Sequence, residues 1–338
     1  MLRRRTFLGS ALGAAAVSVL PQAAFGKKKP PSSSTTPTPI STPTTLRTIR
    51  STDIANYPLD GSTARNGAAA LIAKATAHPQ TPEVIFKEWD ENGVAKGCGV
   101  QYGSAYSNDN RYLLDISKQY PRRIVPVVIL DPVAAETPAV LATMAKENRI
   151  SGVRFRGVPN MPDGTHNFLT APSAPVWEAA DKLGLVVVLM PHSRKIEDRG
   201  QPMQRVAELA VRYPNVIIVL DHMGFPNPVL NPTYGFTPEH LALIQHKNVY
   251  FKYTTLLIEQ LQGGKVPLDA FLDYSVRTFG ANRMVWGSDI GNSEGTMADF
   301  VHHALESAKG LTLKQQKAIF YDTAERIFVP GGRGPARG

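Results

Sequence analysis

Short apolar runs rich in β-branched residues alternate with longer amphipathic segments along most of the chain. Residues 186–189 and 216–220 are apolar at every position, which is typical of strands covered by helices on both faces. This alternation predicts parallel strands joined by crossover helices. The clear strand predictions are Gly99 to Tyr102, Ile124 to Leu130, Gly152 to Arg156, Leu185 to Met190, Val216 to Asp221, Val249 to Tyr253 and Arg283 to Trp286.

The helices between these strands have recognisable starts. Thr81-Pro82-Glu83 and Thr237-Pro238-Glu239 both place proline at the first helical position, and a last helix is predicted from Thr312 to Phe328. With one more strand near Arg50 to Tyr57, the units complete an α/β fold of the (β/α)8 TIM-barrel type in a single domain. The alternative is an open doubly wound sheet, which is less favoured because no Gly-rich phosphate turn follows the early strands.

The two ends of the chain differ from this pattern. Residues 1–26 contain the twin-arginine sequence Arg4-Arg5-Thr6-Phe7-Leu8 and then an apolar run, which predicts a signal peptide for twin-arginine export to the periplasm or the medium. The alternative is an uncleaved N-terminal anchor, because the small-residue cleavage motif at 23–26 is imperfect. Residues 27–45 are rich in Pro, Ser and Thr and predict a disordered linker, 46–330 the barrel, and 331–338 a flexible tail. After signal cleavage we expect no membrane contact.

The formal charge of +9 does not indicate a nucleic-acid partner. Eight positive charges lie in the signal, the linker and the tail, and subtracting them leaves +1 for the predicted barrel. A basic face of the kind that binds nucleic acid is therefore excluded. The single cysteine, Cys98, cannot form an internal disulfide and is interpreted as a small core residue.

Polar residues that follow the predicted strands are the candidates for chemistry, because barrel enzymes build their sites at the carboxyl ends of the strands. His192, His222 and Asp289 each follow a different strand. Two imidazoles and a carboxylate suit zinc or a similar divalent ion, and the carboxylate can also accept a proton from water. Lys252 lies near the end of a further strand and is a candidate for substrate binding.

Two arginines lie on one predicted strand, at Arg154 and Arg156. Because side chains alternate along a strand, we expect only one of them to point into the barrel, where its two-pronged guanidinium would bind a substrate carboxylate. We assign this role to Arg154. The alternative is a salt bridge in the barrel wall.

The other polar residues near these positions have simpler interpretations. Asp221 adjoins His222, so we expect it to face the opposite side and to hydrogen-bond behind the barrel. The remaining histidines fall in loops and helices, and we expect solvated or capping roles for them. These histidines are His78, His166, His240, His246, His302 and His303.

Six segments together are similar to the amidohydrolase-related family of metal-dependent hydrolases, over about residues 81–328. They are GVRFRG, VLMPH, LDHMGFP, VYFKYT, FGANRMVWGSD and IFYDTAERIF. The Asp-His-Met-Gly-x-Pro segment resembles the lactonase branch. The resemblance implies a (β/α)8 barrel, with His192 and His222 as metal or substrate ligands and Asp289 as the proton-transferring carboxylate.

The first strand departs from the family pattern, which has a His-x-His pair there. The best placement is Ser51 to Asn56, where Asp53 and Ala55 take the two histidine positions. Alanine cannot bind a metal. We therefore expect at most one divalent metal, most simply zinc, held by His192, His222 and Asp289 with Asp53 as an additional ligand.

The leading hypothesis is hydrolysis of a lactone, ester or amide bond in a small-molecule substrate. Asp289 would act as general base, and His222, Arg154 or Lys252 would stabilise the oxyanion, with or without a metal. A second hypothesis is decarboxylation of an aromatic or enoic acid, since the same family includes such lyases. A third is a binding protein or degenerate enzyme, because the histidine pair is missing.

Overall fold

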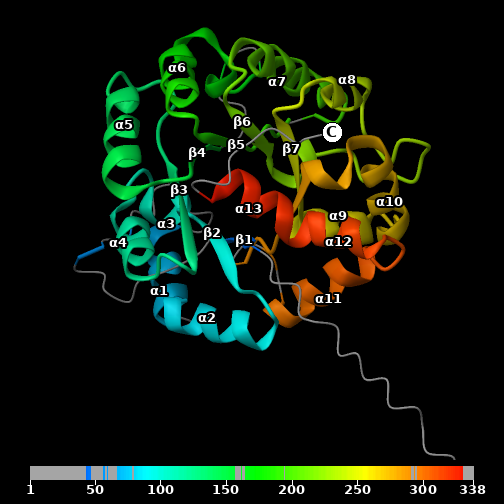
Figure 1. Cartoon of the computed structure of the whole chain (residues 1–338), viewed down its shortest axis with the longest axis horizontal. Helices are drawn as coiled ribbons and strands as arrows, with labels where there is room; N and C mark the ends of the chain where they lie inside the picture. Colours follow the sequence, from blue (N-terminus) through cyan, green and yellow to red (C-terminus); the bar gives the residue numbers. More distant parts are fainter. Residues whose placement is uncertain are drawn as a thin grey trace, which may run out of the picture. The chain divides into compact units, whose positions relative to one another are not determined.

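Eight parallel strands form one sheet in which each strand pairs with the next in sequence (Figure 1). This computed structural model describes residues 43–46, 56–57, 59, 67–77, 80–156, 161, 164–193, 195–290, 293 and 295–329. The strands are β1 Pro43–Leu46, β2 Lys96–Val100, β3 Ile124–Ile129, β4 Gly152–Phe155, β5 Val186–Leu189, β6 Ile217–Leu220, β7 Val249–Thr254 and β8 Met284–Gly287. The first and last strands also contact each other, so the sheet curls into the predicted TIM-type barrel.

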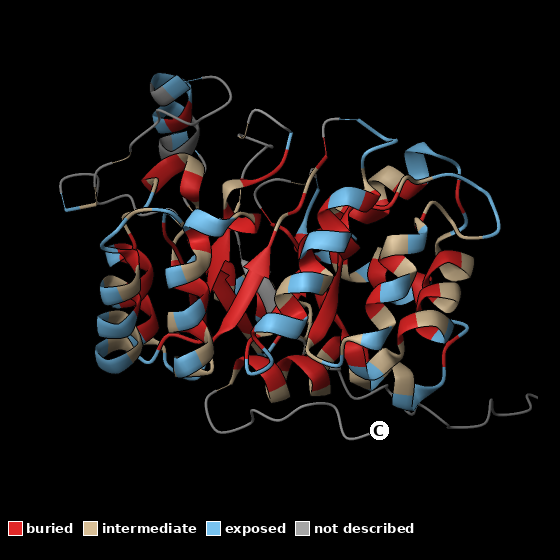
Figure 2. Ribbon diagram, turned by 90° about the horizontal axis from the view of Figure 1, so that it is seen from above, coloured by how far each residue is buried: buried red, intermediate tan, exposed pale blue. Residues whose placement is uncertain are grey.

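Helices surround the sheet, and their buried faces pack against the strands while their outer faces are exposed (Figure 2). The longer helices are α1 Gly67–Ala77, α2 Pro82–Glu91, α4 Arg111–Gln119, α5 Thr137–Asn148, α6 Ala174–Leu183, α7 Gly200–Arg212, α9 Thr255–Gly263, α10 Leu268–Phe279 and α11 Met297–Ser307. The short ones are α3 Gly103–Tyr106, α8 Pro238–Ala242, α12 Leu313–Lys317 and α13 Thr323–Phe328. Among the described residues, no helix has the length and apolar character needed to cross a membrane.

Both predicted Thr-Pro-Glu helix starts are confirmed. Thr81 is the N-cap of α2 and Thr237 the N-cap of α8, with proline next in each. The predicted terminal helix is also confirmed, because α12 and α13 are joined by a π-helical turn at Ala318–Asp322 and end at Phe328.

Strand alternation separates two apolar layers. Val125 and Val127 of β3, with Val186 and Val188 of β5, face the barrel interior, whereas Val187 packs outward against the helices. Cys98 lies in the interior layer, as expected of a core residue, and burial raises the pKa of its thiol to about 12. A thiol with this pKa stays protonated at neutral pH, which argues against a nucleophilic role.

Helix α13 closes the amino-terminal end of the strands (Figure 1). Its residues Ala324, Ile327 and Phe328 belong to the interior layer. The Lys96 ammonium at the start of β2 lies 2.8 Å from the Glu325 carboxylate, and the Ser151 hydroxyl before β4 donates to the Phe328 carbonyl. The opposite, carboxyl end of the strands therefore remains for a site.

The first strand lies earlier than predicted. It comprises Pro43–Leu46, which includes the last three residues of the predicted linker, and it pairs with β2 from Pro43 opposite Lys96 to Leu46 opposite Gly99. Of the predicted stretch 50–57, Asn56 and Tyr57 form a turn and a bend, and the other residues lie outside the described ones. Proline is tolerated as the first residue of a strand, and threonine favours strands, so a segment with a linker's composition can pair here.

Arg283, just before β8, holds the start of β7 in place. Its buried guanidinium donates hydrogen bonds of 2.7–3.0 Å to the carbonyls of Leu243, Ile244, His246 and Val249. We expect Arg283→Met to lower the free energy of unfolding by about 3 kcal/mol or more, because buried carbonyls lose their donors. Urea denaturation measures this change.

The matched control for this prediction is Arg277→Met on the exposed face of α10, where the arginine pairs with Asp273. A surface pair of this kind contributes under about 1 kcal/mol, so the control should unfold nearly as the unaltered protein does. Equal effects of the two substitutions would contradict the assigned role of Arg283.

Candidate active site

Three charged side chains meet inside the barrel near the carboxyl ends of its strands. They are Arg154 of β4, Asp221 directly after β6 and Lys252 of β7, and all three are buried. Arg154 donates to the Asp221 carboxylate through Nε at 2.7 Å, with Nη2 at the same distance from Oδ2, and Lys252 pairs with the other carboxylate oxygen. Together the three side chains carry one net positive charge.

The expectation that Asp221 faces away from the barrel interior is wrong. Asp221 lies two residues after Val219, an interior residue of β6, and alternation gives both the same face. Lys252 likewise lies two residues after the interior residue Tyr250. The prediction assumed that His222 continues the strand and faces inward, but the strand ends at Leu220.

His222 lies instead in a strained turn. Residues Asp221–Gly224 form a tight, non-helical turn, and His222, Met223 and Phe225 have positive φ angles of 52°, 54° and 60°. Each left-handed non-glycine residue costs on the order of 1 kcal/mol, and such strain is typical of functional sites. The turn removes the normal alternation, so His222 and Asp221 both stay buried at this end of the barrel.

A hydrogen bond to β7 fixes the His222 ring. Its Nδ1 lies 2.7 Å from the Thr254 hydroxyl, which also accepts the Leu257 N–H at 3.3 Å as the N-cap of α9. Threonine is a favoured N-cap because its oxygen satisfies a free backbone donor of the first turn. The start of α9 therefore determines the orientation of His222, with Nδ1 occupied by Thr254.

His192 follows β5 and shares an aromatic neighbour with His222. The Phe225 ring centroid lies 5.0 Å from that of His192 and 4.7 Å from that of His222. Burial, and to a lesser degree the charge of Arg199, lowers the pKa of His192. At neutral pH His192 is therefore a neutral imidazole.

The backbone of His192 is held by a second histidine. The Nε2–H of His166 donates to the His192 carbonyl at 2.7 Å, and the His166 side chain is buried. Burial lowers the pKa of His166 to about 4. The expectation of a solvated or capping role is wrong for His166, because the loop before α6 packs into the core and covers this ring.

His240 supports the strained turn in the same way. Its Nε2–H donates to the Gly224 carbonyl at 2.9 Å, while Nδ1 takes part in the capping box with Thr237. The expected capping role is confirmed, but the ring is buried rather than solvated. Burial lowers the pKa of His240 to about 4, outweighing the opposite effect of the Gly224 bond.

Asp289 lies at the same end of the barrel, two residues after β8. Its side chain is buried, and its backbone has a φ of 53°. In the sheet register, Thr254 of β7 is opposite Gly287, so the residue that holds His222 lies beside the strand end that leads to Asp289. The sequence candidates His192, His222 and Asp289 thus follow β5, β6 and β8 at one edge of the barrel.

The described residues do not fit the predicted metal. Among them, no group of three or more His, Cys, Asp or Glu side chains is close enough to hold a metal ion, so His192, His222 and Asp289 do not form a ligand set by themselves. Asp53 lies outside the described residues. Asp221, a carboxylate that lies inside the barrel, is paired with the cations Arg154 and Lys252.

A cavity of about 160 Å³ adjoins this charged group. It is lined by Gln101, Tyr102, Gly103, Ser104, Arg154, Arg156 and Met190, which follow β2 or belong to the ends of β4 and β5. A larger cavity of about 280 Å³ lies at the opposite end of the barrel, against Lys96, Ile124 and Val329. The smaller cavity is a candidate substrate pocket because barrel enzymes bind substrates at the carboxyl ends of their strands, and Arg154 is the residue that connects it to the charged group. His192, His222 and Asp289 lie at the same end of the barrel but do not line this cavity.

The expectation that only one of Arg154 and Arg156 points into the barrel is wrong. Both side chains line the same cavity. Residues two apart on a strand share a face, and Arg156 follows the end of β4 directly. Arg156 and Gln101 are therefore site residues that the sequence did not single out, because each was placed inside a predicted strand, whereas the observed strands end one residue before them, at Phe155 and Val100.

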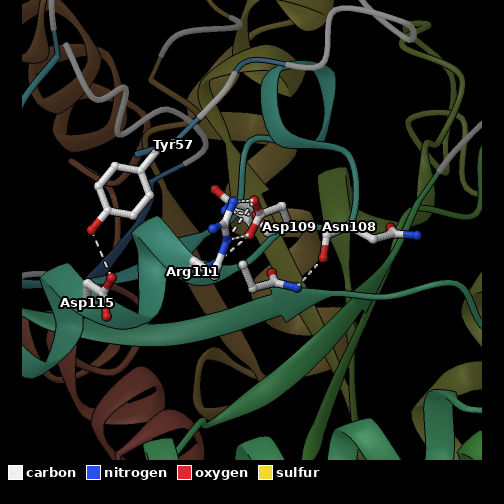
Figure 3. Close-up of polar contacts among 7 residues, drawn as sticks. Tyr57, Asn108, Asp109, Arg111 and Asp115 are labelled. Carbon is white, nitrogen blue, oxygen red and sulfur yellow. Dashed lines mark hydrogen bonds and ion pairs between the residues drawn. The ribbon is translucent and has the colours of Figure 1, made fainter. Parts of the chain in front are cut away.

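The loop after β2 is held by a network of polar contacts (Figure 3). Arg111 donates to the Asp109 carboxylate at 3.0 and 2.6 Å, while the Tyr57 hydroxyl donates to Asp115 at 2.8 Å. The side-chain hydrogen bond from Arg111 lowers the pKa of Asp109. The Asp109 carbonyl in turn accepts from Gln101 Nε2, so this network fixes one wall of the cavity.

Comparison with known proteins identifies related enzymes. The family model described as amidohydrolase (Amidohydro_2) matches residues 56–329. An L-fucono-1,5-lactonase from Burkholderia ambifaria is 26% identical over 226 residues, which cover 62% of this chain and 73% of the relative.

Solved structures show the same fold. A putative 2-pyrone-4,6-dicarboxylic acid hydrolase from Pseudomonas putida superposes with a TM-score of 0.61 at 24% identity, covering 76% of this chain and 93% of that one. A dihydroxybenzoic acid decarboxylase from Polaromonas with bound manganese and an inhibitor gives 0.61 at 14% identity, covering 85% and 96%. Another structure with this fold holds zinc.

The buried ion group makes a testable contribution to stability. Asp221→Asn keeps the side-chain size but leaves Arg154 and Lys252 without their common carboxylate. We expect the free energy of unfolding to fall by about 3–5 kcal/mol, because an uncompensated buried charge is strongly unfavourable. Asp273→Asn, at the exposed pair with Arg277, is the control and should change it by under about 1 kcal/mol. Urea denaturation compares the variants.

Acid should destabilise the fold through the buried histidines. The pKa of His240 is about 4 in the folded protein against 6.5 for the free side chain, so as pH falls between these values the unfolded state binds a proton first. Its contribution is complete above the unfolded pKa, and we expect a loss approaching about 3 kcal/mol near the folded one.

This acid effect is measured by urea denaturation from about pH 7 to about pH 4.5. His240→Gln, whose amide can still donate to Gly224, should show a shallower loss of stability over this range. His302→Gln on the exposed face of α11 should follow the unaltered protein. An unchanged acid dependence in His240→Gln would contradict the assignment.

Proposed function

The chain belongs to the amidohydrolase family, and on this basis we propose that it is a hydrolase of a lactone, ester or amide bond in a small organic acid, with Asp289 as general base. The observation that supports this most directly is the buried group of Arg154, Asp221 and Lys252, whose net charge is positive. Hydrolysis of a carbonyl bond develops negative charge on the carbonyl oxygen. A fixed, buried cationic group suits that charge.

The proposed reaction uses only groups of this chain. Asp289 accepts a proton from water as the oxygen of that water bonds to the carbonyl carbon. The carbonyl electron pair moves to its oxygen, where Lys252, Arg154 or His222 stabilises the oxyanion. The carbonyl then re-forms, the bond to the leaving oxygen or nitrogen breaks, and the proton held by Asp289 passes to the leaving group.

The relatives guide the choice of lactone. The relative from Burkholderia ambifaria is named for L-fucono-1,5-lactone, and the Pseudomonas putida structure for 2-pyrone-4,6-dicarboxylic acid. Both names describe six-membered cyclic esters. We therefore propose a cyclic ester of a small acid as the first substrate class to test.

We also propose that this enzyme works outside the cytoplasm. The Arg4-Arg5 motif and the apolar run after it support twin-arginine export, and such export usually carries proteins that have already folded. The proposed substrate would then be met in the periplasm or the medium.

The general-base assignment is tested with Asp289→Asn. The amide cannot accept the proton from water, so we expect kcat to fall by at least about 100-fold while the thermal unfolding temperature stays close to that of the unaltered protein. The assay follows acid release from a panel of sugar-acid lactones, pyrone carboxylates and aryl esters. Asp273→Asn on the exposed face of α10 is the matched control and should retain full activity.

The same panel separates the alternative functions. Full turnover by Asp289→Asn would remove Asp289 from its role. Release of carbon dioxide from dihydroxybenzoates, without lactone hydrolysis, would identify the protein as a decarboxylase. A solved structure with this fold is named as a dihydroxybenzoic acid decarboxylase. Binding of these acids without any turnover would favour a binding protein.

A further inference from the structure

Gly103 and Arg156 make an unusually close contact at the wall of the cavity of about 160 Å³. Gly103 begins α3 after β2, and Arg156 follows β4, so the two lie on different strand ends. A Cβ atom at position 103 would lie 2.2 Å from Nε, 2.3 Å from Nη2 and 2.4 Å from Cζ of Arg156. No side chain larger than that of glycine leaves room for the guanidinium where it lies now.

The two arginines of the cavity have different partners. Arg154 directs Nε and Nη2 to Asp221, and Nη2 also lies 3.2 Å from the Met190 sulfur. Its Nε and Nη2 are thus engaged in the charged group described above. Arg156 lies half-buried against the backbone of Gly103 and lines the same cavity.

We propose that Arg156, held by Gly103, binds the carboxylate of the substrate, and that Gly103 is a positioning residue for this subsite. The inference rests on the proposed function and moves the carboxylate-binding role from Arg154 to Arg156. An arginine side chain has many rotamers, and a contact that fixes its planar guanidinium before binding lowers the entropy lost on binding. Gln101 and Ser104, from the same loop, add polar groups to the cavity wall.

The loop after β2, which contains Gly103, is held in place by its own hydrogen bonds and by bonds to β3. The Ser107 N–H donates to the Gly103 carbonyl at 3.0 Å, and Gln101 Nε2 donates to the carbonyl of Asp109. The side chain of Asn110 bonds both the N–H and the carbonyl of Ile129, at 2.9 and 2.8 Å. Because the loop is fixed to β3, a Cβ at position 103 displaces the flexible guanidinium and leaves the loop in place.

The test measures carboxylate binding without requiring turnover. Succinate is the probe, and succinamide is its neutral counterpart of similar shape; calorimetric titration gives both affinities. The unaltered protein should bind succinate and discriminate against succinamide. Gly103→Ala and Arg156→Gln should each weaken succinate binding roughly tenfold or more, because a charge-assisted bidentate contact is lost. Arg156→Lys should restore part of the affinity, since the charge remains but the planar fork does not.

Two controls separate this effect from a change in folding. Gly263→Ala, at the end of α9, introduces a Cβ that meets no atom within 4 Å, and it should bind succinate as the unaltered protein does. The thermal unfolding temperature of Gly103→Ala without ligand should match that of Gly263→Ala. The Arg156 variants provide the same test should Gly103→Ala fail to fold.

The binding and turnover measurements separate the carboxylate subsite from the hydrolase function. Equal binding of succinate and succinamide, no succinate binding by the unaltered protein, or unchanged affinity in both Gly103→Ala and Arg156→Gln would overturn it. Arg156-dependent succinate binding in a protein that hydrolyses no lactone would support this subsite while removing the proposed hydrolase function. Lactone hydrolysis with a KM for acidic lactones that neither variant alters would support the function and overturn the subsite.

Discussion

The arrangement of the site depends on one buried carboxylate. Asp221 lies between Arg154 and Lys252, so a single residue connects β4, β6 and β7 across the barrel interior. A charge removed from water is tolerated only when opposite charges and hydrogen bonds compensate it. The registers of these strands are therefore coupled, because a shift of one residue in any strand would turn its charged side chain away from the interior.

Strand β7 supplies a polar partner for each of the two residues that follow β6, Asp221 and His222. Its Lys252 balances Asp221, and its Thr254, two residues later on the same face, holds His222. The backbone between Asp221 and Phe225 is left-handed at three non-glycine positions, and His240 supports this turn through the Gly224 carbonyl. The backbone is thus strained where Asp221 and His222, neighbours in sequence, must both reach the site. The hydrogen bonds to this turn offset the cost of the left-handed residues.

Much of the fold could be predicted from the sequence, because strands covered on both faces are apolar at every position. The first strand could not, since Pro43–Leu46 has the composition of the linker before it and is held by pairing with β2, about fifty residues later in the sequence. Periodicity reports local burial. It carries no information about such non-local pairing.

The residues chosen from the sequence, His192, His222 and Asp289, do come after β5, β6 and β8, while their chemical roles stay predictions. The sequence did not predict the burial of His166 and His240, because loop packing covers them, nor the left-handed turn that breaks alternation after β6. The roles of Arg156 and Gln101 also depend on a cavity between three strand ends. Such a cavity is a property of assembled loops, which no local pattern encodes.

The helix that closes the barrel, α13, is the last described helix of the chain. Its Ala324, Ile327 and Phe328 complete the interior layer that begins with residues of β2. The interior therefore stays open on the ribosome until the chain has been synthesised through Phe328. The final turns of helix then seal a core that includes β2, where Lys96, the partner of Glu325, was synthesised 229 residues earlier.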